Sequence, residues 1–317
     1  MDERRDEFAE GGARARRALV REIEAYGALT DPAWRDAFAT VPRHLFVPYY
    51  YVPGNGGYER LWCGDPDPGQ RDRWLRGAYE DTAVATRVRD GELLSSASQP
   101  SLMALMLHAL DVRDGDDVLE IGAGTGYNAA LLCHRLGEEH VTTVDLDEEI
   151  TESARTHLAA AGYRPAVVTA DGARGCPERA PYDRIVATCA VPSVPYPWIA
   201  RCRPGALVLT PLSTGLLLLR VRDRAHAEGR FLATSAYFVA LRGAAGRVPR
   251  PDPAGDERFR FLWGLVGGTL DRREALSLWL RERRPERERF GVTVSGDRQW
   301  AWLDDPAGPY AWPLPDA

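Results

Sequence analysis

The chain has 317 residues, a length that fits either one large domain with an appendage or two domains. Its formal net charge of −6 argues against a surface that binds nucleic acid without sequence preference. No apolar run approaches the roughly 20 residues that span a bilayer, and the first residues lack the apolar stretch of a signal peptide. We therefore expect a cytoplasmic protein with neither a nucleic acid nor a membrane as its partner.

The cysteines and histidines do not show the spacing of a metal site. The five cysteines contain no CxxC pair, and most of them lie in apolar segments, which predicts buried, reduced thiols. The histidines at 108, 134, 140 and 157 lack ligand spacing, so we expect no bound metal. His44 stands beside Phe46 and Val47, where a structural hydrogen-bonding role is the more frequent one.

The N-terminal part begins with helices and then changes character. Apolar residues at helical spacing predict an amphipathic helix over 13–26, and the Thr-Asp-Pro sequence at 30–32 predicts the start of a second helix that runs through Phe38. Residues 48–77 are rich in Pro and Gly. A turn-rich stretch of this length is typical of a functional or mobile segment.

From Asp117 onward, strands and helices alternate. Short apolar or β-branched runs predict strands at 118–122, 140–147, 166–171, 182–190 and 206–212, and helices are expected at 127–136, 148–162 and 197–203. This alternation predicts a Rossmann-like α/β fold, a doubly wound and mostly parallel sheet with helices on both faces. Residues 216–223 and 231–241 are expected to form an antiparallel hairpin at the sheet edge.

After Gly243 the composition shifts again. Residues 245–257 have the composition of a linker, and one helix at 273–284 and two strands near 290–303 follow. Five of the nine tryptophans fall here, which suits either the core of a small domain or an aromatic surface for a peptide. We therefore predict an N-terminal helical and substrate-proximal region (1–100, with an insertion at 49–76), a cofactor-binding core (101–243) and a C-terminal peptide-binding extension (244–317).

Three glycines follow the first strand of the core and open the next helix. Gly122, Gly124 and Gly126 have the spacing GxGxG, and glycine is needed where a backbone turns sharply beside a ligand. A dinucleotide-binding turn has GxGxxG, whose third glycine would stand at position 127. Tyr127 occupies that position. The turn therefore favours a nucleoside without a diphosphate over NAD.

Acidic residues follow the same series of strand ends. Asp145 ends the second strand and can accept hydrogen bonds from ribose hydroxyls, although it could instead cap the helix at 148–162. Asp171 and Gly172 end the third strand, where they can bind an adenine, and Glu120 could reach the amino-acid end of the cofactor. The pattern predicts S-adenosylmethionine as the cofactor, bound by Glu120, Gly122, Ala123, Gly124, Thr125, Gly126, Asn128, Asp145, Leu146, Asp171 and Gly172.

Several segments together resemble the protein L-isoaspartate O-methyltransferase family. They are VPRHLFVP (41–48), GAYED (77–81), SSASQP (95–100), VLEIGAGTGYNAALL (118–132), DG (171–172) and APYDRIV (180–186). The spelling of SSASQP with GAGTGYNAALL is similar to the branch that modifies ribosomally made peptides beside lanthipeptide synthetases or ATP-grasp macrocyclases. Those enzymes carry a C-terminal extension that residues 245–317 resemble.

The resemblance implies a carboxyl O-methyltransferase that uses S-adenosylmethionine. It implies that Ser98 lies nearest the reacting carboxylate and that Ser96 supports it. The alternative is that both serines cap the helix that begins near Pro100. The insertion at 49–76 and the sequence before SSASQP depart from the repair enzymes, and both changes lie where a peptide substrate is expected to bind.

These observations lead to one main hypothesis and three alternatives. The main hypothesis is esterification of an aspartate in a ribosomal precursor peptide that a macrocyclase has modified, followed by formation of a succinimide and isoaspartate. The first alternative is general repair of isoaspartyl proteins. The others are an NAD-type dehydrogenase and a non-catalytic peptide-binding protein on the same fold.

Overall fold

A computed structural model describes residues 8–54, 57–89, 91–243 and 256–315. The chain divides into two compact units, which we describe separately. The first unit comprises Met1–Gly115, Ala123–Thr143 and Asp147–Val167. The second comprises Asp116–Gly122, Val144–Leu146 and Val168–Ala317.

The described part of the first unit begins with two helices, and both were predicted. Helix α2 (Ala9–Ala25) buries Leu19, Val20 and Ile23, whereas Tyr26, the fourth apolar residue of the predicted pattern, lies just past its end and is 71% exposed. Helix α3 (Pro32–Thr40) follows. The Asp31 side chain accepts a hydrogen bond from the Ala33 backbone N–H, and Pro32 supplies a preset φ at the first helical position. These two features explain why α3 begins where it does.

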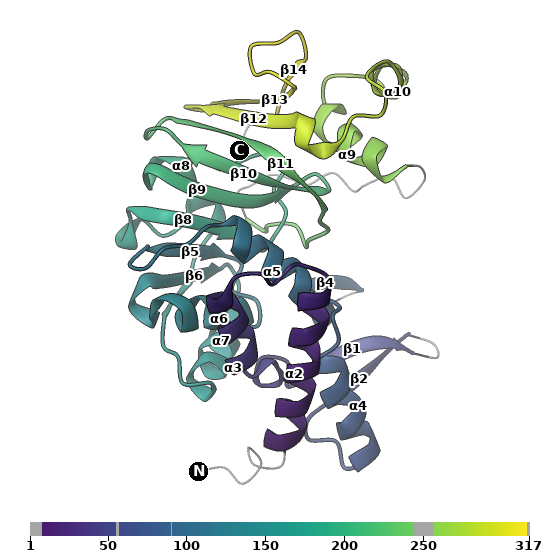
Figure 1. Ribbon diagram of the computed structural model, residues 1–317, viewed down its shortest axis with the longest axis vertical. Helices are drawn as coiled ribbons and strands as arrows, with labels where there is room; N and C mark the ends of the chain where they lie inside the picture. The colour runs from purple at the N-terminus through teal and green to yellow at the C-terminus, as the bar shows by residue number, and fades with distance from the viewer. Residues whose placement is uncertain (1–7, 55–56, 90, 244–255, 316–317) are drawn as a thin grey trace. The chain divides into compact units, whose positions relative to one another are not determined.

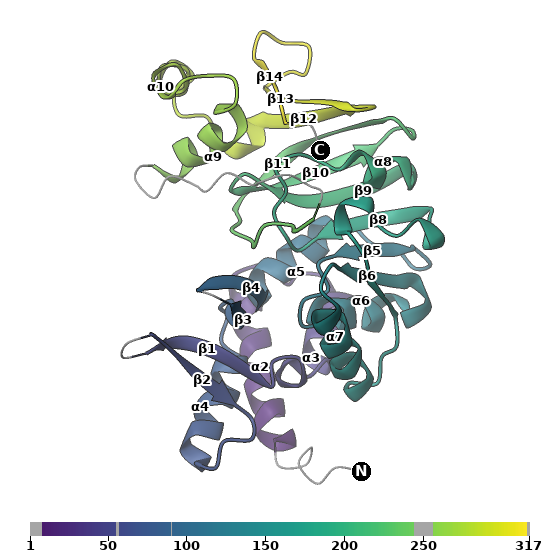
Figure 2. The same ribbon diagram turned by 180° about the vertical axis from the view of Figure 1, so that it is seen from behind.

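A four-stranded sheet of order β2-β1-β3-β4 belongs to the same unit. Strands β1 (Tyr49–Gly54) and β2 (Gly57–Trp62) form an antiparallel hairpin (Figure 2), and α4 (Pro68–Ala78) follows it. The expectation of a turn-rich stretch over 48–77 is therefore wrong. The run Tyr49–Val52 has strong β propensity, and the Pro and Gly residues gather at the ends of the elements.

The rest of the first unit combines the predicted helices with two strands, β3 and β4, that the sequence analysis did not predict. Strands β3 (Val84–Arg89) and β4 (Glu92–Ala97) precede α5 (Pro100–Ala109), and the helices α6 (Tyr127–Leu136) and α7 (Glu148–Ala160) are confirmed. Short 3-10 turns lie at Arg43–Leu45 and Glu138–His140. Helix α7 begins at Asp147, whose carboxylate accepts from the backbone N–H of Glu149, and Gly162 follows its end at φ +91°.

The larger described sheet has the order β14-β13-β12-β11-β10-β9-β8-β5-β6-β7 (Figure 1), and its strands β5 and β8 to β14 belong to the second unit. Strands β5 and β8 pair in parallel, as do β8 and β9, whereas every pairing from β9 to β14 is antiparallel. The strands of the predicted core are β5 (Val118–Ile121), β6 (Val141–Asp145), β7 (Ala166–Thr169), β8 (Tyr182–Ala187) and β9 (Cys202–Leu212).

The predicted edge hairpin is present with different bounds. It consists of β10 (Gly215–Val221) and β11 (His226–Ser235), so its second strand begins and ends earlier than expected. Helix α8 (Tyr196–Ala200) precedes β9, and short 3-10 turns lie at Gly172–Arg174, Pro177–Arg179 and Arg287–Arg289. Buried aromatic side chains, among them Trp198, Phe231 and Phe261, fill the core beside the sheet.

The C-terminal residues contain more helix than predicted. Most of the expected linker at 245–257 lies outside the described residues, but Glu257 already begins an unpredicted helix, α9 (Glu257–Val266). The predicted helix is α10 (Arg272–Arg281), with a capping box between Asp271 and Glu274. The two predicted strands are β12 (Phe290–Ser295) and β13 (Arg298–Leu303), and β14 (Ala311–Pro313) pairs with β13.

The tryptophans of this region serve mainly as core residues. Trp279, Trp302 and Trp312 are all at most 6% exposed, which favours the structural interpretation of these three. All five cysteines are free thiols, and every one except Cys63 is buried. Among the described residues, no helix combines the length and the apolar character that crossing a membrane requires.

Candidate active site

The glycine turn adopts a backbone that its sequence makes possible. Gly122, Gly124 and Gly126 have φ values of +99°, +51° and +86°, in the region that side chains with a Cβ rarely occupy. Gly126 also lies close to α7, because a Cβ built on it would be 3.3 Å from the Ala154 carbonyl oxygen. A GxGxG sequence is therefore required by the fold of the turn itself.

Tyr127 explains the departure from a dinucleotide-binding turn. Its side chain is 5% exposed, and its ring centroid lies 5.6 Å from that of Phe46 and 6.3 Å from that of Phe38. The Arg43 guanidinium lies 5.8 Å from the ring centroid, and burial raises the pKa of Tyr127. The residue that replaces the third glycine thus joins the start of α6 to the aromatic core of the first unit.

The carboxyl ends of β5, β6 and β7 lie side by side in the second unit. The Gly122 backbone N–H donates to the Val144 carbonyl at 2.8 Å, and the Ala170 N–H donates to the Asp145 carbonyl at 2.9 Å. This edge therefore carries Glu120, Asp145, Leu146, Asp171 and Gly172, as predicted. Glu120 is 1% exposed, so its carboxylate is withdrawn from water.

Asp145 does not cap the helix that follows it. Asp147 is the N-cap of α7, and its carboxylate accepts from the backbone N–H groups of Glu149 and Ile150. The Asp145 carboxylate instead lies 3.1 Å from Arg242 Nη2. The capping alternative is therefore wrong, and a carboxylate remains at the end of β6, as ribose binding requires.

Residues 241–243 approach both strand-end acids of the second unit. Arg242 contacts Asp145, and a Cβ on Gly243 would lie 2.7 Å from Asp171 Oδ1. Gly243 has φ +108°, which allows the backbone to pass this close. Asp171 Oδ1 also accepts from the Ala173 N–H at 3.0 Å, and this bond fixes the carboxylate. Sequence analysis missed Arg242 because nothing in the local pattern marks it.

Of the predicted acceptor serines, Ser96 lies in β4 and Ser98 lies between β4 and α5, and neither caps the helix. The N-cap of α5 is Gln99, which makes no side-chain capping bond. Asp81 performs this role from a distance, since its carboxylate accepts from the Ser101 N–H at 2.8 Å and from Gln99 Nε2 at 3.2 Å. Among the described residues, the hydroxyls of Ser96 and Ser98 have no hydrogen-bond partner. The capping alternative for both serines is therefore wrong.

Arg43 is a buried residue that holds the acceptor segment, SSASQP (95–100), in place. It is completely buried and donates hydrogen bonds to the backbone carbonyls of Ala78, Thr82 and Ser98, the last two at 3.3 and 3.1 Å. Burial lowers the pKa of this guanidinium. The arginine of RHLFVP thus ties the GAYED segment to SSASQP by charge-assisted bonds.

His44 is a structural residue, as expected from its neighbours. Its Nδ1 lies 2.7 Å from the Tyr79 hydroxyl, and its ring stands 6.3 Å from that of Trp74 in an edge arrangement. Burial lowers the pKa of His44 to about 4, so the ring is neutral at pH 7.

A small pocket of about 50 Å³ adjoins the glycine turn within the first unit. Its lining includes Tyr49, Thr86, Ser95, Gly124 and His157. A Cβ on Gly124 would lie 3.8 Å from Ser95 Oγ and from the Ser96 carbonyl oxygen, so β4 passes directly beside the turn. The His157 Nδ1–H donates to the Thr125 carbonyl at 3.0 Å, and burial lowers the pKa of this histidine.

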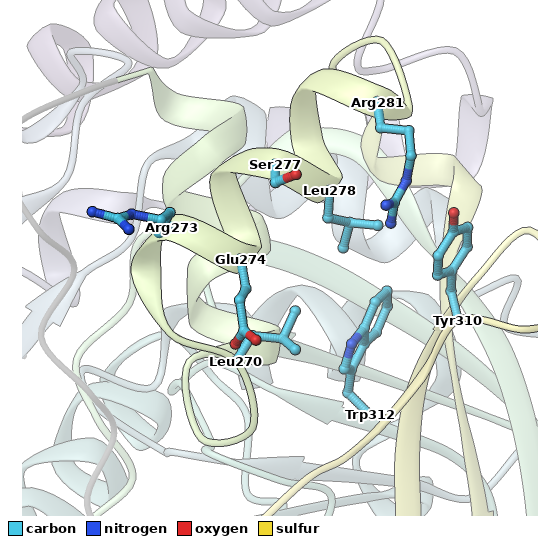
Figure 3. A pocket seen from close by; sticks show the side chains of 8 residues that line it. All are labelled: Leu270, Arg273, Glu274, Ser277, Leu278, Arg281, Tyr310 and Trp312. Atoms are coloured by element: carbon cyan, nitrogen blue, oxygen red, sulfur yellow. The ribbon is translucent and has the colours of Figure 1, made fainter.

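A larger pocket of about 430 Å³ lies in the C-terminal part of the second unit. Figure 3 shows it between α10 and the end of the chain, with Tyr310 and Trp312 side by side and Arg281 directed toward Tyr310. The two rings stack with centroids 6.1 Å apart, and the Arg281 guanidinium lies 5.6 Å from the Tyr310 centroid. The lining combines an apolar floor with Arg273, Glu274 and Arg281, which suits a ligand that has both an apolar and a charged part.

The sheet with acids at three adjacent strand ends, and the glycine turn before α6, together define a Rossmann-like methyltransferase. Residues 70–243 match the family model described as protein-L-isoaspartate(D-aspartate) O-methyltransferase (PCMT). A protein-L-isoaspartate O-methyltransferase of Hyperthermus butylicus is 34% identical over 247 residues, which cover 73% of this chain and 90% of that protein. This chain therefore belongs to the protein-L-isoaspartate O-methyltransferase family.

Solved structures show the same fold. A protein-L-isoaspartate O-methyltransferase matches with a TM-score of 0.64 at 23% identity, over 94% of this chain and 98% of that one. A Plasmodium falciparum protein of the same description, in complex with S-adenosyl-L-homocysteine, matches with a TM-score of 0.54 at 13% identity, over 71% of this chain and 97% of that one. The predicted fold class, the O-methyltransferase activity and the cofactor S-adenosylmethionine are confirmed.

The structural match also corrects one argument from the sequence. Because it covers 94% of this chain, most of residues 244–317 fall inside it. A chain described simply as a protein-L-isoaspartate O-methyltransferase therefore has a comparable C-terminal part. The extension does not by itself separate a peptide-modifying branch from the repair enzymes.

Proposed function

We propose that this enzyme methylates the carboxyl group of isoaspartyl residues in polypeptides, as its relatives are named for doing. The observation that carries the proposal is the family match over residues 70–243. That range holds the acceptor segment with Ser98, the glycine turn and the strand-end acids. General repair is thus better supported than a function dedicated to one ribosomal peptide.

The chemistry of the proposed cofactor residues fits S-adenosylmethionine. In the second unit, Asp145 would accept from the ribose hydroxyls, Asp171 and Gly172 would bind the adenine, and Glu120 would face the amino-acid end, with Gly122 and Leu146 beside them. In the first unit, the turn Ala123–Gly126 and Asn128 at the start of α6 are the remaining residues that we propose for cofactor binding. When bound, the cofactor supplies an electrophilic methyl carbon on a sulfonium.

The residues beside the acceptor carboxylate need not act as a base. An ionised carboxylate is already a nucleophile, so the protein must orient it and exclude water rather than remove a proton. The Ser98 hydroxyl, which has no partner among the described residues, would donate one hydrogen bond to the acceptor carboxylate, with Ser96 in support. The Arg43 bond to the Ser98 carbonyl would keep that hydroxyl in position.

A peptide pair tests this function directly. One synthetic peptide carries an isoaspartyl residue and its twin carries aspartate at the same position. Incubation with enzyme and cofactor should add the mass of one methyl group to the isoaspartyl peptide only. Absence of methylation on several isoaspartyl peptides, by an enzyme that binds S-adenosylhomocysteine, would refute the proposal.

A second candidate is esterification of an aspartate in a macrocyclised ribosomal precursor peptide. It is favoured by the β1–β2 hairpin, which lies before the family match begins at residue 70. Methanol is a better leaving group than hydroxide, so the backbone nitrogen after the esterified aspartate would displace it and form a succinimide, which hydrolyses to isoaspartate or aspartate. Mass spectrometry of cyclised precursor peptides should show a methyl ester and then loss of methanol.

We also propose that the C-terminal extension binds part of the polypeptide substrate. The pocket between α10 and Tyr310 supports this, because Arg273 and Arg281 stand at the rim of an apolar floor formed by Leu270, Leu278 and Trp312. Arg281→Ala should raise KM for long peptides and leave KM for a minimal isoaspartyl peptide unchanged. An equal change for both lengths would contradict this role.

A further inference from the structure

The β1–β2 hairpin has two chemically different faces. The inner face carries Tyr50, which is 2% exposed and donates its hydroxyl hydrogen to the Trp74 carbonyl of α4 at 3.1 Å, and Leu61, which is 3% exposed. The outer face carries the alternate residues of both strands, which the register pairs as Tyr49 with Trp62, Tyr51 with Arg60 and Pro53 with Tyr58. Aromatic residues thus cover much of the outer face, and Tyr58 is 62% exposed.

Arg60 lies among these aromatic rings. Its guanidinium is 4.7 Å from the Tyr49 centroid and 5.4 Å from the Trp62 centroid. Within the described part of the chain, Arg60 has no ion pair, and its side chain is exposed. The rings hold the guanidinium in one place, so its charge is preorganised for an anionic partner.

The register of the sheet connects this face to the acceptor segment. Arg60 pairs with Tyr51, Tyr51 with Ala85 of β3, and Ala85 with Ser96 of β4. Directly paired residues point to the same side of a sheet, so these four side chains form one row across the outer face. Tyr49 of this face also lines the small pocket beside Gly124 and Ser95.

We propose that this outer face is the docking surface for the polypeptide that carries the acceptor carboxyl, and that Arg60 selects an acidic residue in its flank. The inference rests on the proposed function, since it assigns a place to the substrate of that same site. The occupant is a peptide rather than a nucleic acid because the chain has a net charge of −6 and Arg60 is a single cation among rings.

The geometry gives the spacing of the preferred substrate. Neighbouring strands are about 4.8 Å apart, so the row from Ser96 to Arg60 spans about 14 Å. An extended peptide advances about 3.4 Å per residue, so about four residues separate the position beside Ser96, which supports the acceptor site, from a side chain at Arg60. The small Ala85 in the middle of the row leaves room for the backbone of the peptide to cross β3.

The experiment compares three isoaspartyl peptides. They differ only at the two positions that lie four residues before and four residues after the acceptor, where they carry Glu, Gln or Lys. Wild-type enzyme should show kcat/KM about tenfold higher for the Glu peptide than for the Lys peptide, through KM. Arg60→Glu should reverse this order, and Tyr58→Ser should raise KM for all three peptides several-fold.

Matched controls come from helix α2. Arg21→Glu changes an exposed arginine for which no ion pair is described, and Tyr26→Ser changes a tyrosine that is 71% exposed, both away from the hairpin. Neither control should alter the preference. An unchanged order of peptides in Arg60→Glu, with normal binding of S-adenosylhomocysteine, would overturn the docking surface.

Fluorescence anisotropy of labelled peptides separates docking from catalysis. If wild-type enzyme binds the Glu peptide more tightly than the Lys peptide but methylates neither, the docking surface stands and the proposed activity fails. If it methylates both equally and Arg60→Glu changes nothing, the activity stands and the docking surface fails. Concentration-dependent dimerisation that Tyr58→Ser abolishes would assign the face to a second copy and overturn the proposal.

Discussion

Arg242 Nη2 lies 3.1 Å from Asp145 Oδ1, although 97 positions separate the two residues in the chain. The guanidinium therefore touches the carboxylate that we propose for the ribose hydroxyls. Both residues belong to the second unit, where a Cβ on Gly243 would lie 2.7 Å from Asp171 Oδ1. Cofactor affinity should consequently respond to changes at both ends of this ion pair.

Asp145→Asn should weaken binding of S-adenosylhomocysteine by about 10- to 100-fold, because a hydrogen bond to a charged group contributes about 1.5–3 kcal/mol. Isothermal titration calorimetry measures this. Asp147→Asn is the matched control, since it changes the N-cap of α7 and should leave the affinity nearly unchanged. Equal losses in both variants would indicate a structural effect and contradict the ribose role.

Ser98→Ala should lower kcat by about tenfold and leave the affinity for S-adenosylhomocysteine unchanged, because the loss of one orienting hydrogen bond costs about 1–2 kcal/mol. Ser98→Thr keeps the hydroxyl and should retain most of the activity. Steady-state kinetics on an isoaspartyl peptide give the comparison. Full activity in Ser98→Ala would exclude the serine from the reaction.

Arg43→Met should destabilise the protein by about 3–5 kcal/mol, since it leaves the buried Ala78 carbonyl and the partly buried Thr82 and Ser98 carbonyls without their charged donor. Chemical denaturation gives the free energy of unfolding. Arg60→Met changes an exposed arginine and should cost less than about 1 kcal/mol. A small loss in Arg43→Met would show that water replaces the guanidinium.

His44 should make stability depend on pH between about 4 and 6.5. Burial lowers its pKa from 6.5 to about 4 in the folded state, so the unfolded chain binds more protons in this window and stability falls as the pH falls. The contribution from His44 at pH 5 relative to pH 7 is about 2 kcal/mol. Urea unfolding at both pH values should show a smaller difference for His44→Asn than for wild type.

Tyr127→Gly would complete a GxGxxG turn and so tests the dehydrogenase alternative. We expect a loss of about 3–5 kcal/mol of stability, because the ring fills the space beside Phe46 and Phe38. We expect no gain of NADH binding, which fluorescence titration would detect. Tight NADH binding by this variant would revive the dehydrogenase interpretation.

Local chemistry made most of the core predictable. The GxGxG turn, the N-cap at Asp31 and the strand-end acids each leave a signature within a few residues, and the structure places them as expected. The comparisons then supported the family that RHLFVP and SSASQP had suggested.

The features that were missed depend on contacts distant in sequence. Asp81 caps a helix that begins about 20 residues later, and Arg242 reaches Asp145 across the chain, so neither shows a local pattern. The hairpin was missed because its prolines and glycines outweighed three consecutive tyrosines. Helix α9 was missed because its first turn, at Glu257, was assigned to the linker.

The β1–β2 hairpin offers a way for the substrate range of this enzyme to change. It joins the rest of its sheet through β1 and β3 and precedes the family match at residue 70. Mutations on its outer face leave the glycine turn and the strand-end acids untouched. Natural variation or directed evolution could therefore replace the outer-face residues of 49–62 together. Tyr50 and Leu61 of the inner face would be kept, because both are buried and Tyr50 donates to the Trp74 carbonyl of α4.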